Sequence, residues 1–328
     1  MRNFIKLPFE LKPLLIAYHH DVYTLGIVQG HNSLEKITPW LCGRYLTCFY
    51  GYMGGNDLFS KDPVDIWGDQ DDIIWRSCFY MPATLEGFPK TEMLDLIRFM
   101  LENHHYVTGR YNEKYIPGKS FYLSKDYMHD FILYGYDDDR QVFFSAGYMG
   151  NGRCEGFEIS YENLYQSVLN GLLGKYQFEF MLYNPEARFD LSLDRIAMEL
   201  SDYIHSTSYR PLGWAKRIYG MDSVRMLQQV FLREAEMEYP YIDSRFTRSL
   251  MEHKYMQLFC MRYLAQQKIS TNTDLALLED NYNKACLVHN LGIKTNMSGN
   301  RDGCKRIAAM IGEILEKDNI NFSKPDII

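Results

Sequence analysis

MHDFILYGYDDDRQVFF, residues 128–144, is the stretch of this chain that decides the fold. It holds two apolar runs, one centred on Phe131 and one on Phe143, separated by the polar segment 137–140. Aspartate favours turns because its carboxylate accepts hydrogen bonds from nearby backbone N–H groups. Two apolar runs of strand length joined by such a turn predict a β-hairpin.

Strand and helix signals alternate around this hairpin. Runs rich in aromatic and β-branched residues predict further strands at 72–80, 105–111 and 176–183. Helices are expected at 39–52, where Pro39 suits a first turn, at 91–103 after Thr91, and at 160–171 after Ser160. The glycine and proline residues in 53–72 predict that this segment is mostly loop. The N-terminal part is therefore expected to be α+β.

The pattern becomes helical after Asn184 and Pro185. Ile196, Leu200 and Tyr203 recur at helical spacing, the segment 242–267 contains neither glycine nor proline, and the apolar residues of 307–315 follow the same period. We therefore predict two domains, an α+β domain over 1–185 and an all-helical domain over 186–328.

Composition excludes several classes of protein. The net charge of −7 argues against nucleic acid as the main partner, since phosphate binding needs clustered Lys and Arg. No apolar run approaches the ~20 residues of a membrane span, and residues 1–15 lack the features of a secretory signal. The seven cysteines include no CxxC pair, which argues against structural zinc. A cytoplasmic protein without membrane association is expected.

His129 is the first candidate for chemistry. A histidine at the mouth of a buried hairpin strand is where papain-type enzymes keep their general base, opposite a cysteine at the N-terminus of an earlier helix. Residues 115–144, YIPGKSFYLSKDYMHDFILYGYDDDRQVFF, resemble the N-terminal domain of the butirosin biosynthesis protein H family, which is related to the bacteriocin-processing cysteine peptidases. The usual pattern of that family is H-x-x-L-x-Y-G-Y-D. Residues 242–264 also look like the helical part of such relatives.

The resemblance implies a papain-like cysteine-peptidase fold and acyl or peptidyl transfer in the biosynthesis of peptides or other natural products. The acyl group would pass from a carrier-protein thioester to an amine, or a peptide would be cleaved. An acyl carrier protein or a peptide is the implied partner, and no cofactor is implied.

The nucleophile of that family aligns with Val22, which has no nucleophilic atom. The thiols nearest in sequence are Cys42 and Cys48. Cys42 precedes Gly43 and is the best available nucleophile, with a buried helical cysteine as the alternative.

The sequence also offers no carboxylate at the position expected to orient His129. Asp137 lies eight residues along the same strand, about 26 Å away, and is expected to accept turn hydrogen bonds instead. The returning strand is expected to bring Ser145 to Tyr148 opposite His129, where no carboxylate lies. Ser145, Tyr148 or Asn151 remain as orienting groups.

A non-catalytic function is an alternative hypothesis. The missing catalytic groups favour a catalytically inactive relative that binds a peptide, a carrier protein or a partner enzyme. A mixed-charge helix within 243–262 is either a salt-bridged face or a docking site for a carrier protein. The histidines at 19, 20, 31, 104 and 105 lack the i, i+4 spacing of a helical zinc pair, so no metal site is expected.

Overall fold

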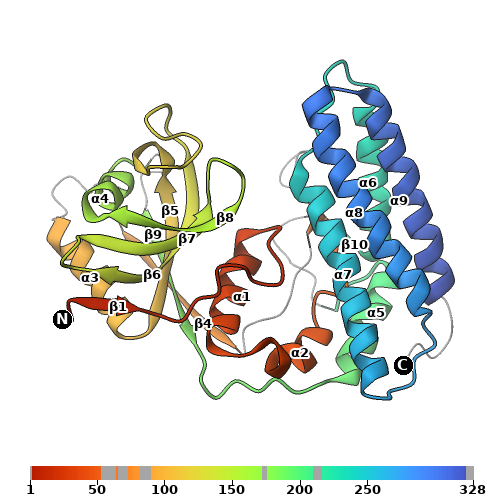
Figure 1. Cartoon of the computed structure of the whole chain (residues 1–328), viewed down its shortest axis with the longest axis horizontal. Helices are drawn as coiled ribbons and strands as arrows, with labels where there is room; N and C mark the ends of the chain where they lie inside the picture. The colour runs from red at the N-terminus through yellow and green to blue at the C-terminus, as the bar shows by residue number, and fades with distance from the viewer. Residues whose placement is uncertain are drawn as a thin grey trace. The chain divides into compact units, whose positions relative to one another are not determined.

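The computed structural model describes residues 2–52, 64–65, 73–81, 90–171, 176–209 and 216–322. The chain divides into two compact units, one of residues 1–34 and 70–188 and one of residues 35–69 and 189–328 (Figure 1). The change of character expected after residue 185 is close to the boundary after Arg188. Residues 35–69 belong to the second unit, however, although their place in sequence suggested the first.

The first unit is built on an antiparallel sheet with strand order β4-β9-β5-β6-β7-β8, and β1 pairs with β6. Its strands are β1 (Phe4–Lys6), β4 (Ile74–Met81), β5 (His105–Asn112), β6 (Met128–Asp137), β7 (Val142–Tyr148), β8 (Cys154–Ser160) and β9 (Tyr176–Tyr183). The predicted hairpin is β6–β7, and Asp137 Oδ1 accepts hydrogen bonds from the backbone N–H groups of Asp139 and Arg140 in its turn. The α+β class and the turn role of Asp137 are thus confirmed.

Helices accompany this sheet. They are α1 (His19–His31), α3 (Lys90–Glu102) and α4 (Tyr161–Leu169), with a short 3-10 turn, η1 (Glu113–Tyr115), after β5. Figure 1 shows α3 and α4 against the sheet, and both pack on β5. Ser160 Oγ accepts from the backbone N–H of Asn163 and caps α4, as its sequence position predicts.

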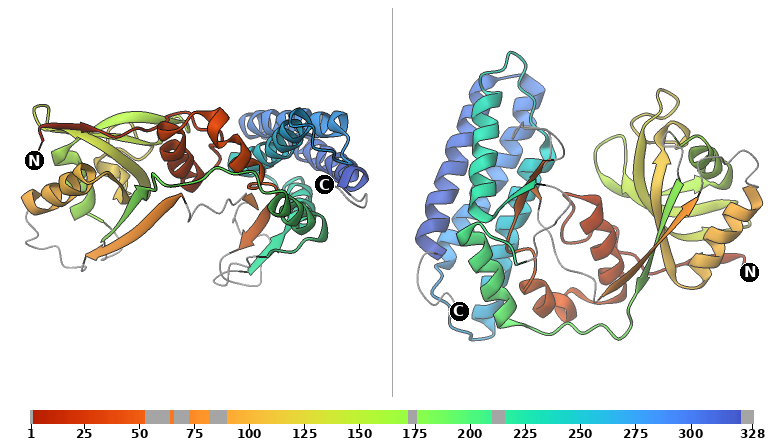
Figure 2. Two further views of the ribbon diagram at one scale, coloured as in Figure 1. Left: turned by 90° about the horizontal axis from the view of Figure 1, so that it is seen from below. Right: turned by 180° about the vertical axis from the view of Figure 1, so that it is seen from behind.

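The second unit is mainly helical. It contains α2 (Leu34–Cys42), α5 (Leu193–His205), α6 (Gly220–Glu234), α7 (Ser244–Gln266), α8 (Leu275–Ser298) and α9 (Arg301–Phe322), with a small sheet of β2 (Phe49–Tyr52), β3 (Val64–Asp65) and β10 (Lys216–Tyr219). Helices α6 to α9 lie side by side (Figure 2). None of the helices in the described ranges is long and apolar enough to cross a membrane.

The helix predicted over 39–52 is wrong in its second half. Helix α2 ends at Cys42, Gly43 follows, and Tyr45 takes a φ of 63°, a conformation that interrupts a right-handed helix. Residues 49–52 instead pair with β3 and β10 as strand β2. Aromatic residues suit a pleated surface better than a helix interior, which explains the strand.

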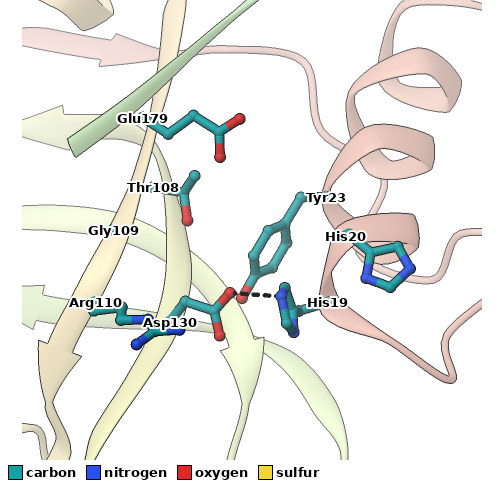
Figure 3. Close-up of a pocket in the computed structure, with 8 residues that line it drawn as sticks. All are labelled: His19, His20, Tyr23, Thr108, Gly109, Arg110, Asp130 and Glu179. Carbon is teal, nitrogen blue, oxygen red and sulfur yellow. Dashed lines mark ion pairs between the residues drawn. The ribbon is translucent and has the colours of Figure 1, made fainter. Parts of the chain in front are cut away.

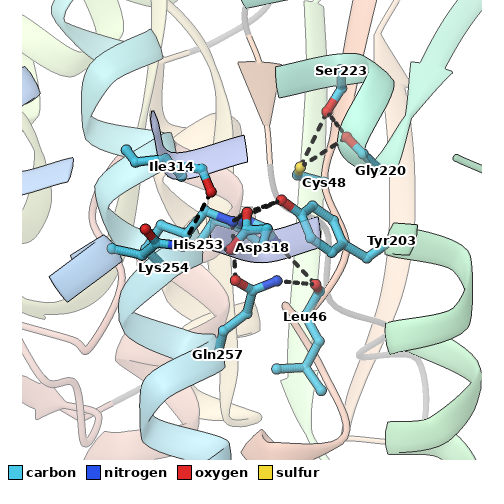
Figure 4. A network of polar contacts seen from close by, with 11 residues as sticks. Leu46, Cys48, Tyr203, Gly220, Ser223, His253, Lys254, Gln257, Ile314 and Asp318 are labelled. Atoms are coloured by element: carbon cyan, nitrogen blue, oxygen red, sulfur yellow. Dashed lines mark hydrogen bonds and ion pairs between the residues drawn. The ribbon is translucent and has the colours of Figure 1, made fainter. Parts of the chain in front are cut away.

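A buried polar network holds the helices of the second unit in register (Figure 4). Lys254 Nζ lies 2.5 Å from Asp318 Oδ2 and donates to Tyr203 Oη at 2.8 Å. Asp318 also accepts from the Tyr203 hydroxyl and from Asn281 Nδ2. The charged ends of Lys254 and Asp318 are fully buried. This ion pair and its hydrogen bonds therefore connect α5, α7, α8 and α9.

Candidate functional site

An open pocket of about 190 Å³ lies in the first unit between the start of α1 and the sheet (Figure 3). Strands β5, β6 and β9 form its floor and α1 forms the opposite wall. The lining residues are His19, His20, Tyr23, Thr108, Gly109, Arg110, Asp130 and Glu179.

Strand register explains why these side chains converge. Arg110 pairs with Asp130, and Thr108 pairs with Glu179. Residues that pair directly in an antiparallel sheet lie on the same face, and so do residues two apart on one strand. Three strands therefore present these four side chains to the same side of the sheet.

Helix α1 supplies the other wall. His19 and Tyr23 are four residues apart and share a helix face, and His19 Nε2 lies 3.1 Å from Asp130 Oδ2. Figure 3 shows the Tyr23 hydroxyl directed towards Asp130. The Tyr23 side chain is buried, and its hydroxyl has no hydrogen-bond partner within the part of the chain that the structure describes. Burial, with the nearby Asp130 carboxylate, raises the pKa of Tyr23 well above its usual value.

His129 stands beside this pocket with a carboxylate partner. Its Nδ1 atom lies 3.5 Å from Oε1 of Glu113, the first residue of η1, and its ring centroid lies 6.4 Å from that of His19. Burial raises the pKa of Glu113, while Lys119 and His129 act in the opposite direction. A carboxylate therefore does face His129, but it comes from η1 and not from the returning strand.

Glu113 is distant from His129 in sequence and reaches it from the side opposite to β7. Strand β5 lies on that side, with Tyr111 paired to His129, and Glu113 follows two residues later. The separation of 3.5 Å makes an ion-pair contact longer than an ordinary hydrogen bond.

The described hydrogen bonds and strand pairing of the orienting residues expected from sequence involve partners other than His129. Ser145 is fully buried and pairs with Leu133, and the Tyr148 hydroxyl donates to the backbone carbonyl of Ile16. Asn151 bonds with residues of its own loop, donating to Glu155 and accepting from the backbone N–H of Arg153.

The expected nucleophile also lies elsewhere. Cys42 is fully buried in the second unit, at the C-terminal end of α2, and its side chain contacts that of Cys260. A thiolate is favoured at a helix N-terminus rather than a C-terminus, so this position does not activate Cys42. Cys48 is also buried in that unit, with Sγ 3.1 Å from Ser223 Oγ. Val22 is fully buried in α1.

Cys154 is a described thiol close to the pocket residue Tyr23, and its surroundings disfavour the thiolate. Burial raises the pKa of Cys154 to about 11, although the neighbouring Lys119 favours its thiolate. Burial lowers the pKa of Lys119 to about 8, and its Nζ donates to the Tyr148 carbonyl at 2.6 Å. The described lining residues therefore offer imidazoles, carboxylates and hydroxyls, and none of them carries a thiol.

Among the residues in the described ranges, no group of three or more His, Cys, Asp or Glu side chains has a geometry that could hold a metal ion. A comparison with models of known protein families, and another with curated proteins, found no match for this chain.

Proposed function

We propose that the first unit is a peptide-binding module on a papain-like scaffold that does not use thiol catalysis. The observation that carries this proposal is the polar pocket between α1 and the sheet, which has no cysteine among the lining residues that the structure describes. The residue aligned with the nucleophile of the cysteine-peptidase family is Val22, which is fully buried. Cys42, the substitute expected from sequence, is enclosed in the other unit.

Charge favours a ligand with a protonated amine, such as a peptide N-terminus. Asp130 and Glu179 supply carboxylates, and Thr108 and Tyr23 supply hydroxyl oxygens, all of which accept hydrogen bonds from an ammonium group. Arg110 supplies donors for a peptide carbonyl. The Tyr23 hydroxyl gains from such a ligand a partner that it lacks among the described residues.

The test compares two probes that differ in one group, Ala-Ala-amide and N-acetyl-Ala-Ala-amide. Calorimetric titration of the full chain at neutral pH should show binding of the free amine and a loss of at least about tenfold in affinity on acetylation, because acetylation removes the charge. Asp130→Asn and Tyr23→Phe should weaken binding of the amine. Glu186→Gln, an exposed carboxylate outside the pocket, is the matched control. If neither probe binds, or Asp130→Asn behaves as the control does, peptide binding at this pocket is refuted.

A second function, acyl or peptidyl transfer without a covalent enzyme intermediate, is favoured by one observation. Two histidine–carboxylate pairs, His19–Asp130 and His129–Glu113, lie with their imidazoles 6.4 Å apart. One imidazole would take a proton from an attacking amine while the other gives a proton to the leaving group. A carrier-protein thioester would then be the acyl donor.

Acetyl-N-acetylcysteamine thioester with Ala-Ala-amide separates the two functions. Transfer predicts N-acetylated product, a loss of rate in both His129→Ala and His19→Ala, and no acetylated protein by mass spectrometry. A binding module predicts equal product with and without protein, although the amide still binds.

A further inference from the structure

Five large apolar or aromatic side chains are exposed together at one end of the helical unit. Met237, Tyr239 and Tyr241 come from the connection between α6 and α7, and Ile293 and Met297 lie one turn apart near the end of α8. Tyr239 and Met297 are 83% and 85% exposed. We call these five residues the bundle-end patch. Exposed apolar clusters of this kind commonly mark protein interfaces.

The two halves of the patch are fixed to one another. Asn296 on α8 accepts from the backbone N–H of Ile242 at 2.8 Å and donates to its carbonyl at 2.5 Å. Ile242 itself is buried, and Glu234 Oε2 accepts from the backbone N–H of Tyr241 at 2.9 Å. The side chains are therefore presented on an anchored connection.

The charges beside the patch form an acidic half on the connection and a mainly basic half at the end of α8, in which the exposed Asp302 follows Arg301. Glu236 and Glu238 alternate with Met237 and Tyr239 on the connection, whereas Lys294 and Arg301 flank Met297. All four charged side chains are exposed, and none of them forms an ion pair with another residue that the structure describes.

We infer that the bundle-end patch is the interface of a two-fold symmetric homodimer. In such an interface the same surface meets itself, so the acidic half of one copy faces the basic half of the other. Both sets of charges are then satisfied while the apolar side chains are covered. A uniformly acidic or basic partner would match one half and repel the other, which makes a second copy of this chain the occupant that the charge pattern fits.

Charge reversal tests the dimer without relying on loss of folding. The full chain should sediment as a dimer at about 100 μM. The double variants E236K/E238K and K294E/R301E should each dimerise at least about tenfold more weakly, because like charges then face each other. Mixing the two variants should restore dimers, since each reversed half now meets its complement, and native mass spectrometry should identify them as heterodimers.

Two controls complete the design. Met297→Ser should weaken the dimer without changing its charge, and Lys268→Glu, at an exposed position after α7, should leave it unchanged. Circular dichroism establishes that each variant is folded. A wild-type chain that stays monomeric at about 100 μM overturns the inference. Failure of the mixed variants to form heterodimers overturns it equally.

Discussion

The ion pair between Lys254 and Asp318 gives a prediction whose size follows from its surroundings. Lys254 Nζ contacts Asp318 at 2.5 Å, Tyr203 Oη at 2.8 Å and Gln257 Oε1 at 3.0 Å, so all three ammonium protons have acceptors. The side chains are 1% and 0% exposed. Lys254→Met removes the cation and leaves the Asp318 carboxylate enclosed with only neutral partners.

Breaking a buried pair from one side costs about 3–5 kcal/mol because an uncompensated charge remains. This is a large fraction of the ~5–15 kcal/mol that stabilises a typical domain. The hydrogen bonds from Lys254 to Tyr203 and Gln257 are already lost in Lys254→Met. The double variant K254M/D318L also removes the carboxylate, and the only further losses among the described residues are the hydrogen bonds that Tyr203 and Asn281 donate to it. Lost neutral hydrogen bonds cost about 1 kcal/mol apiece. We therefore expect the double variant to be more stable than Lys254→Met alone.

Urea denaturation followed by circular dichroism at neutral pH measures these differences. The matched control is Lys317, which pairs with Asp280 at the surface of the same helical unit, so Lys317→Met should cost less than about 1 kcal/mol. The reasoning is refuted if Lys254→Met costs no more than Lys317→Met. It is also refuted if the losses from Lys254→Met and Asp318→Leu simply add in the double variant.

Two further predictions follow from buried groups. Burial raises the pKa of Glu199 to about 7, with Arg195 acting in the opposite direction, so the folded state binds a proton that the unfolded state releases near its ordinary pKa. The free energy of unfolding should therefore fall by on the order of 3 kcal/mol as pH rises from about 5 to 8. Urea denaturation midpoints measured across this range should show the decrease, and Glu199→Gln should remove most of it. A decrease that is unchanged in Glu199→Gln contradicts the assignment. Iodoacetamide should label Cys42, Cys48 and Cys260 only after unfolding, because each side chain is buried. Fast labelling of Cys42 in the native protein that is slowed by His129→Ala would instead support Cys42 as a nucleophile activated by His129.

Several of the elements predicted from sequence have one buried face. Helices α3, α5 and α9 bury apolar residues at helical spacing, and the β6–β7 hairpin has an aspartate turn, so local patterns were sufficient. Helix α1 shows no such pattern, because eight consecutive residues from Asp21 to Val28 are buried. A helix enclosed on all sides carries no amphipathic period, so its role as a pocket wall became visible only in the structure.

The site itself was only partly predictable for a related reason. His129 was identified because one strand carries it, but its partner Glu113 is sixteen positions earlier and reaches it through pairing of β5 with β6. Likewise, closeness in sequence suggested Cys42, although that residue packs in the other unit. Chain proximity is a poor guide here because residues 35–69 leave the sheet domain between α1 and β4.

The enclosure of α1 also bears on how the pocket would work. Since this helix is buried along two full turns, His19 and Tyr23 project from a fixed frame towards strands whose register is set by continuous pairing. A ligand therefore meets groups already in place, and little ordering entropy opposes its binding. The same rigidity leaves Val22 enclosed, so restoring a thiol there by Val22→Cys should yield a buried, unreactive sulfur rather than a working nucleophile.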